Sequence, residues 1–279
     1  MSWRIRAFFG VLGLLIVLPP EVFAQSAGQS AKAKAQSNSP VAPAASGAPA
    51  SLSHDLSGVW MQYPDGLVPG LPGMNAIDQR FRPPLTTYGQ ARFDASRPLV
   101  GPRAVPGQEN SPTLNCDPDG PPRVLNLPNP FEIVQISGRV FMFFEEQHVW
   151  RTIWADGRAL PKDPEPSWLG YSVGRWEGDT FVVETAGFND KQWVDGFGNP
   201  RSDKTHLIER YRRLNHDTLE LQIIIDDPKS YLGVWTNPPK LHKLETSWEI
   251  GEWFCVADED RAYDDVIRLP AGGAAPSHK

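Results

Sequence analysis

The sequence predicts an all-β protein, an antiparallel meander that closes into a β-barrel. From Phe131 onward, runs of apolar and β-branched residues are separated by tight-turn signals such as Ser137-Gly138 and Asp156-Gly157. No long helical pattern lies between these runs, so we expect consecutive strands to pair as hairpins. Closure into a barrel is one way in which such a sheet removes its exposed edges.

Eight or nine segments have the pattern of a strand. They span residues 58–62, 131–136, 140–146, 148–154, 171–176, 180–185, 205–214, 218–225 and 241–249. The hairpins at 175–184 and 213–221 are similar, but two copies are too few for a propeller. An outer-membrane barrel is disfavoured because charges fall on both alternating faces of the strands, leaving no apolar band toward lipid. These charges are Arg151, Arg175, Glu184, Glu209, Arg210 and Arg212.

Residues 1–24 have the pattern of a cleavable secretory signal peptide. Arg4 and Arg6 precede an apolar run, 8–18, which ends before Val22-Phe23-Ala24. The run is shorter than the roughly twenty residues that a permanent transmembrane helix needs. We therefore expect a periplasmic or secreted protein with no stable membrane span after cleavage.

The remaining chain divides into a tether, one domain and a tail. Residues 25–50 consist mainly of Ala, Ser, Gln, Pro and Gly without an aromatic residue, which predicts a disordered tether. Residues 51–268 are expected to form a single β-barrel domain, and 269–279 a disordered tail.

A proline-rich segment, 63–130, precedes the main group of strands. It has one helix pattern, in which Thr86 or Thr87 is the N-cap and the helix ends at Ala95, before Arg97-Pro98. Long irregular segments in compact domains are often functional. We expect this one to be irregular apart from one short helix and to cover part of the barrel.

Composition limits the partners of the protein. The formal net charge is −6, which makes nucleic acid a poor partner. Cys116 and Cys255 are the two cysteines of an exported chain, so we expect a disulfide between them. The histidines show no short paired spacing, and no nucleotide-binding motif is present, so neither a metal nor an organic cofactor is predicted.

Two resemblances support this fold. The opening strand, 55–60, with Gly58-Val-Trp60, is similar to the Gly-x-Trp strand that begins lipocalin-like (calycin-like) barrels. The phrases at 127–132, 150–158 and 170–180 resemble those of a family of uncharacterised secreted bacterial proteins, over about residues 56–256. That resemblance implies export and a β-rich fold, and carries no activity with it.

Four residues are candidates for acid–base catalysis. Glu184 and Glu209 stand in otherwise apolar strands, where an ionised carboxylate needs a partner or a shifted pKa. His148, near Glu146, could exchange a proton with a substrate in a barrel cavity. Ion pairs on a solvated sheet face explain the same carboxylates without catalysis, and the sequence does not show which face is inward.

Aromatic residues supply the candidates for ligand binding. In the strand 148–154, His148, Trp150, Thr152 and Trp154 share one face, and Arg151 lies on the other. Inside a barrel the first face would form a stacking wall; the alternative, which we favour, is an exterior or core stripe. The loop 189–198 could contact a ligand at the barrel mouth. The full set of ligand-binding candidates is Trp150, Arg151, Trp154, Tyr171, Asp190, Trp193 and Tyr211.

Three functional hypotheses follow. The first is an exported barrel that binds a small apolar, aromatic or glycan-like molecule. The second is a cofactor-free lyase, isomerase or hydrolase that uses a His/Glu pair in the barrel cavity. The third is an interaction module with exposed tryptophans. The sequence leaves open whether the protein is an enzyme, which molecule it handles and its oligomeric state.

Overall fold

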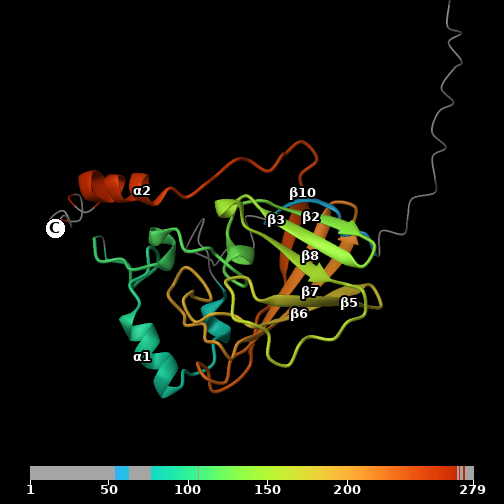
Figure 1. Cartoon of the computed structure of the whole chain (residues 1–279), viewed down its shortest axis with the longest axis horizontal. Coiled ribbons are helices and arrows are strands. Elements are labelled where there is room, and N and C mark those ends of the chain that lie inside the picture. The colour runs from blue at the N-terminus through green and yellow to red at the C-terminus, as the bar shows by residue number, and fades with distance from the viewer. Residues whose placement is uncertain (1–53, 63–76, 106, 269, 271–272, 274–279) are drawn as a thin grey trace, which may run out of the picture. The chain divides into compact units, whose positions relative to one another are not determined.

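The computed structural model describes residues 54–62, 77–105, 107–268, 270 and 273. The expected signal peptide, 1–24, and tether, 25–50, lie outside the described residues, as does most of the expected tail, 269–279. Within the described part, the chain is mostly sheet and the predicted all-β barrel is confirmed (Figure 1).

The strands of the described residues form one sheet in the order β10-β1-β2-β3-β4-β5-β6-β7-β8-β9. Nine of them close the barrel, because β10 pairs with both β1 and β8. The strands are β1 (Gly58–Gln62), β2 (Phe131–Ile136), β3 (Arg139–Phe144), β4 (Trp150–Trp154), β5 (Tyr171–Glu177), β6 (Thr180–Ala186), β7 (His206–Asn215), β8 (Thr218–Asp226), β9 (Trp235–Thr236) and β10 (Lys240–Leu244).

One pairing departs from the expected antiparallel meander. β4 and β5 run parallel and pair only through Ile153 with Ser172 and Trp154 with Val173. Parallel neighbours require a crossover connection, and the long segment 155–170 provides it. The turn signal at Asp156-Gly157 therefore begins a crossover and not a hairpin.

Alternation along the strands fills the barrel with apolar side chains. β8 shows this most clearly, since its buried and half-buried residues alternate over its whole length. At one end of the interior, the Trp60 indole donates to the Leu56 carbonyl, and the guanidinium group of Arg213 lies 5.1 Å from the Trp60 ring. The largest buried apolar side chains include Trp60, Phe131, Phe144, Phe181, Tyr211 and Trp235.

The predicted short helix is confirmed as α1 (Thr87–Ala95). The Thr86 hydroxyl caps it by accepting a hydrogen bond from the amide of Gly89. Gly89 also allows α1 to lie against the loop before β9, because a Cβ atom here would stand 2.0 Å from the Ser230 carbonyl oxygen. The proline-rich segment therefore docks on the end of the barrel through backbone contacts.

Several elements differ from expectation. The strand expected over 148–154 begins at Trp150, because Glu146–His148 forms the 3-10 helix η6, with left-handed φ angles of 53° and 51° at Gln147 and His148. The strand expected over 241–249 ends at Leu244, and β9 was not predicted. The other helices were not predicted: α2 (Ala257–Tyr263), η3 (Gln79–Phe81), η4 (Pro112–Asn115), η5 (Val124–Asn126) and η7 (Asp264–Arg268).

The predicted disulfide is present. Cys116 and Cys255 are bonded, with an S–S distance of 2.02 Å and a sequence separation of 139. Cys116 follows η4 directly, and Cys255 lies just before α2, so the bond joins the proline-rich segment to the C-terminal segment. None of the helices in the described part of the chain combines the length and the apolar character of a membrane span.

Candidate functional site

A crevice opens where the two parallel strands diverge, and we call it the β4–β5 crevice. Its volume is about 400 Å³. The strands pair only at the end of β4, so residues 150–152 have no strand partner on this side. The lining residues are Trp150, Arg151, Thr152, Trp154, Ser167, Trp168, Leu169, Gly170, Tyr171 and Ser172.

The face that the sequence left undecided lies on the outside of the barrel. Trp150 is exposed, and Thr152 and Trp154 are half-buried, whereas Arg151 and Ile153 are buried in the interior. The tryptophans of β4 therefore form the wall of an external crevice and do not fill the barrel. His148 does not share this face, because it belongs to η6 and not to β4.

Arg158 holds two aromatic walls of the crevice in place. Its guanidinium group lies 3.8 Å from the centre of the Trp154 ring and donates to the Tyr171 hydroxyl over 3.1 Å. Asp156 accepts three hydrogen bonds from the same guanidinium group, at 2.9, 3.1 and 2.6 Å. Arg139 also lies over the Trp154 ring, at 4.7 Å. Trp154 and Tyr171 are thus oriented before any ligand arrives.

Trp150 and Trp168 are the tryptophans that offer surface to a ligand. The Trp150 side chain is 54% exposed, and Trp168 is half-buried. Beside these rings, Thr152 and Ser167 contribute hydroxyl groups to the lining. Aromatic faces next to hydroxyl groups match a ligand that has both an apolar face and polar substituents, as a sugar ring has.

The barrel interior contains a separate polar network, made by Arg151, Glu209 and Tyr211. Arg151 donates two hydrogen bonds to the Glu209 carboxylate, one of them 2.8 Å long, and Tyr211 also donates to it. Burial, followed by the charge of Glu209, raises the pKa of Tyr211 well above its ordinary value. All three side chains are almost completely buried. The buried Glu209 carboxylate is therefore stabilised by its ion pair with Arg151.

Besides the crevice and the interior network, two buried carboxyl groups stand out, Asp119 and Glu146. Asp119 forms an ion pair with Arg123 over 3.1 Å. Burial raises the pKa of Asp119 to about 6. Burial and, after it, the neighbouring charge of Asp119 raise the pKa of Glu146 to about 8. Within the described residues the Glu146 carboxyl group has neither a hydrogen-bond partner nor an ion-pair partner.

The structure does not bring the four predicted catalytic residues together. Glu209 lies inside the barrel, while Glu184 lies on the outer face, where it pairs with Arg175 and His206. Glu146 precedes Gln147, whose side chain accepts a hydrogen bond from the Asp119 amide. The His148 ring packs against Phe254 of the C-terminal segment, with ring centres 4.4 Å apart.

Four of the seven predicted ligand-binding residues do meet: Trp150, Arg151, Trp154 and Tyr171 line the β4–β5 crevice. The guanidinium group of Arg151 binds Glu209 in the interior. Tyr211 belongs to that interior network. Asp190 and Trp193 lie in the loop after β6, where Trp193 is buried with Arg123 near its ring.

Sequence reasoning missed Arg158, Trp168 and Asp119. Arg158 and Trp168 belong to the crossover 155–170, and Asp119 to the proline-rich segment, so strand periodicity gave no signal for them. Among the residues that the structure describes, no three His, Cys, Asp or Glu side chains gather as potential metal ligands.

Comparisons with protein-family models, with curated proteins and with solved structures gave no match.

Proposed function

We propose that this protein is an exported β-barrel that binds a small glycan-like or aromatic molecule in the β4–β5 crevice. The observation that carries the proposal is the convergence of Trp150, Trp154, Trp168 and Tyr171 on one cavity of about 400 Å³. Aromatic rings fixed in orientation reduce the entropy lost on binding. Arg158 supplies that fixation for Trp154 and Tyr171.

Export is part of the same proposal. The disulfide between Cys116 and Cys255 supports it, because disulfides persist in the periplasm and outside the cell and are rare in the cytosol. The resemblance to a family of secreted bacterial proteins supports it as well. The test is to express the full chain with a C-terminal tag and to sequence the mature N-terminus; we expect cleavage after Ala24 in exported material, and an uncleaved cytosolic protein would contradict export.

Binding is tested by tryptophan fluorescence during titration with mono- and oligosaccharides, and by calorimetry with indole and phenol, which absorb and emit in the same range as the protein. We expect a saturable change with at least one class, which is reduced in Trp150→Ala and in Trp168→Ala. Trp253→Ala is the matched control, because Trp253 is 46% exposed and lies in the C-terminal segment, outside the crevice lining. No response to either class, or an equal loss in Trp253→Ala, would contradict the proposal.

A second candidate function is acid–base catalysis at Glu146. The Glu146 carboxyl group has no hydrogen-bond or ion-pair partner among the described residues, and burial raises its pKa to about 8, so that it can act as an acid near neutral pH. Nitrophenyl glycosides and esters are suitable probes. We expect turnover that falls about 100-fold in Glu146→Gln. Glu177→Gln is the control, since Glu177 pairs with Arg175 and Arg210 and is not among the groups that act on Glu146. Equal turnover in Glu146→Gln and wild type would exclude the role.

A further inference from the structure

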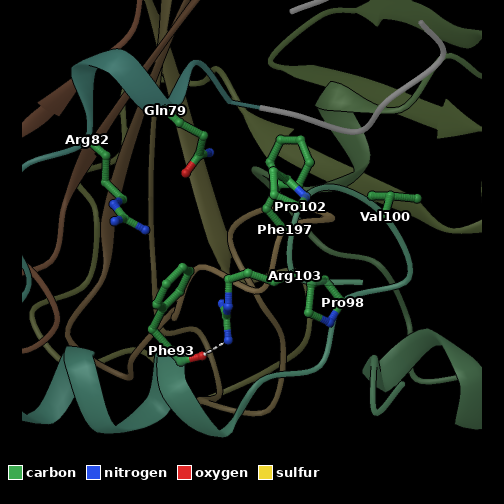
Figure 2. A pocket seen from close by; sticks show the side chains of 8 residues that line it. All are labelled: Gln79, Arg82, Phe93, Pro98, Val100, Pro102, Arg103 and Phe197. Atoms are coloured by element: carbon green, nitrogen blue, oxygen red, sulfur yellow. Dashed lines mark hydrogen bonds between the residues drawn. The ribbon is translucent and has the colours of Figure 1, made fainter. Parts of the chain in front are cut away.

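A second cavity lies in the proline-rich segment, and we call it the arginine pocket (Figure 2). Its volume is about 390 Å³. It shares no lining residue with the β4–β5 crevice. The lining residues are Gln79, Arg82, Phe93, Pro98, Val100, Pro102, Arg103 and Phe197.

Most of the wall of the arginine pocket is apolar. Phe93 comes from α1, Pro98 and Val100 from the loop that follows, and Phe197 from the loop after β6. Gly101 allows this loop to approach Phe197: its φ angle is +88°, and a Cβ atom there would stand 2.4 Å from the Phe197 ring. The wall is therefore fitted together from segments almost a hundred positions apart in the sequence.

Two guanidinium groups provide the polar part of the arginine pocket. Arg82 and Arg103 lie 4.6 and 3.8 Å from the centre of the Phe93 ring, and Figure 2 shows both side chains directed toward this ring. Arg103 donates to the carbonyl oxygens of Phe93 and Ser96, and Arg82 donates to the Asn199 side chain. These bonds fix both groups beside the cavity.

Among the described residues, no ion pair neutralises the positive charge at the arginine pocket. In the described part of the chain, no carboxylate lies within ion-pair distance of Arg82 or Arg103. Burial lowers the pKa of Arg103, and Arg97 and Arg82 lower it further, while Asp94 opposes them. An anion between the two guanidinium groups would relieve this repulsion and accept charge-assisted hydrogen bonds from them.

We propose that the arginine pocket binds a small organic carboxylate, whose apolar part packs against Phe93, Pro98, Val100 and Phe197 and whose carboxylate lies between Arg82 and Arg103. The volume suits a compound with one ring or a short aliphatic chain. Because the arginine pocket is separate from the β4–β5 crevice, failure of one binding proposal would not affect the other.

The test uses benzoate and its uncharged analogue benzamide, with the full exported chain. Calorimetry and amide chemical shifts measure binding and place it. We expect benzoate to bind with shifts at Gly101 and Arg103, and benzamide to bind about tenfold more weakly or worse, since it lacks the charge. Shifts confined to Gly170 and Tyr171 would place benzoate in the crevice and overturn the proposal, as would equal affinities or no binding of benzoate.

Variants assign the effect to the pocket. Arg82→Met is expected to weaken benzoate binding about tenfold, with a smaller loss in Arg82→Lys, which keeps the charge. Arg92→Met is the matched control. It also removes one positive charge, from the α1 residue next to Phe93, but Arg92 does not line the pocket. An equal loss in Arg92→Met would reduce the effect to general electrostatics and overturn the proposal.

Discussion

Arg151 and Glu209 form a bidentate ion pair in the closed interior of the barrel, joining β4 to β7 across the core. Tyr211 donates a third hydrogen bond to the same carboxylate. Arg151 points into the barrel, whereas its neighbours Trp150 and Thr152 on β4 line the crevice outside. The ion pair therefore holds β4, which pairs with β5 at only two positions, to β7.

Replacing Arg151 with Met is expected to destabilise the fold by about 3 to 5 kcal/mol, because the buried Glu209 carboxylate loses its counter-charge. Chemical unfolding followed by circular dichroism measures the change. The double replacement Arg151→Met, Glu209→Leu should recover much of the loss. Arg175→Met is the control, since its exposed pair with Glu184 is worth about 1 kcal/mol or less. Equal effects in the two single variants would show that burial of the pair is unimportant.

The double replacement Cys116→Ser, Cys255→Ser is expected to lower the free energy of unfolding by about 4 to 5 kcal/mol, because the disulfide closes a long loop in the unfolded chain. Chemical unfolding with and without a reductant measures it. The chain has two cysteines, so a reductant should destabilise the wild type and leave the double variant unchanged. A reductant effect on the double variant would contradict this assignment.

Arg158→Met is expected to weaken ligand binding in the crevice about threefold or more, because Trp154 and Tyr171 lose the group that orients them. Stability should change by about 1 kcal/mol or less, since the Arg158 pair with Asp156 is exposed to solvent. Fluorescence titration and chemical unfolding separate the two effects. Unchanged affinity would show that the rings hold their orientation without Arg158.

Glu146→Gln is expected to flatten the pH dependence of stability between about pH 5 and 8. A carboxyl group whose pKa rises on folding, here from 4.5 to about 8, binds its proton more tightly in the native state. Its stabilising effect is therefore complete at low pH and is lost as the pH rises through this window. Glutamine mimics the protonated form. The free energy of unfolding of the variant, relative to that of the wild type, should therefore rise toward pH 8 by an amount on the order of 2 to 4 kcal/mol.

Unfolding in urea at pH 5, 6, 7, 8 and 9 measures this difference. The comparison between wild type and variant is needed because other groups titrate too; burial lowers the pKa of His242 to about 3, and its effect on stability has the opposite sign. The groups that act on Glu146 are Asp119, Arg123 and Glu145. A constant difference between the two proteins from pH 5 to 9 would show that Glu146 is ionised throughout.

Local patterns allowed most of the barrel to be predicted. The hairpin turn after Ile136 and the alternation in β8 are short-range features, and the observed strands follow them closely. β9 was missed because it has only two residues. Left-handed backbone at Gln147 and His148 removed His148 from the predicted strand. Histidine is enriched in this conformation, but most histidines do not adopt it, so the residue type alone did not predict it.

The sequence predicted the types of residue in the candidate site but not where in the fold the site would form. The aromatic residues of β4 and the start of β5 were identified, but Arg158 and Trp168 lie in a crossover that the sequence presented as an ordinary connection. Asp119 and Glu146 approach each other only after the proline-rich segment folds back on η6. Contacts between distant segments have no periodic signal in the sequence.

The sequence by itself determined the strand segments, the short helix and the disulfide partners, because alternation, capping and cysteine count act over short range or by composition. Only the tertiary structure decided that β4 and β5 run parallel, that the tryptophans of β4 face outward and that Arg151 faces inward. The reason is physical: a period of two separates the two faces of a strand, but which face becomes the interior depends on how the whole sheet closes.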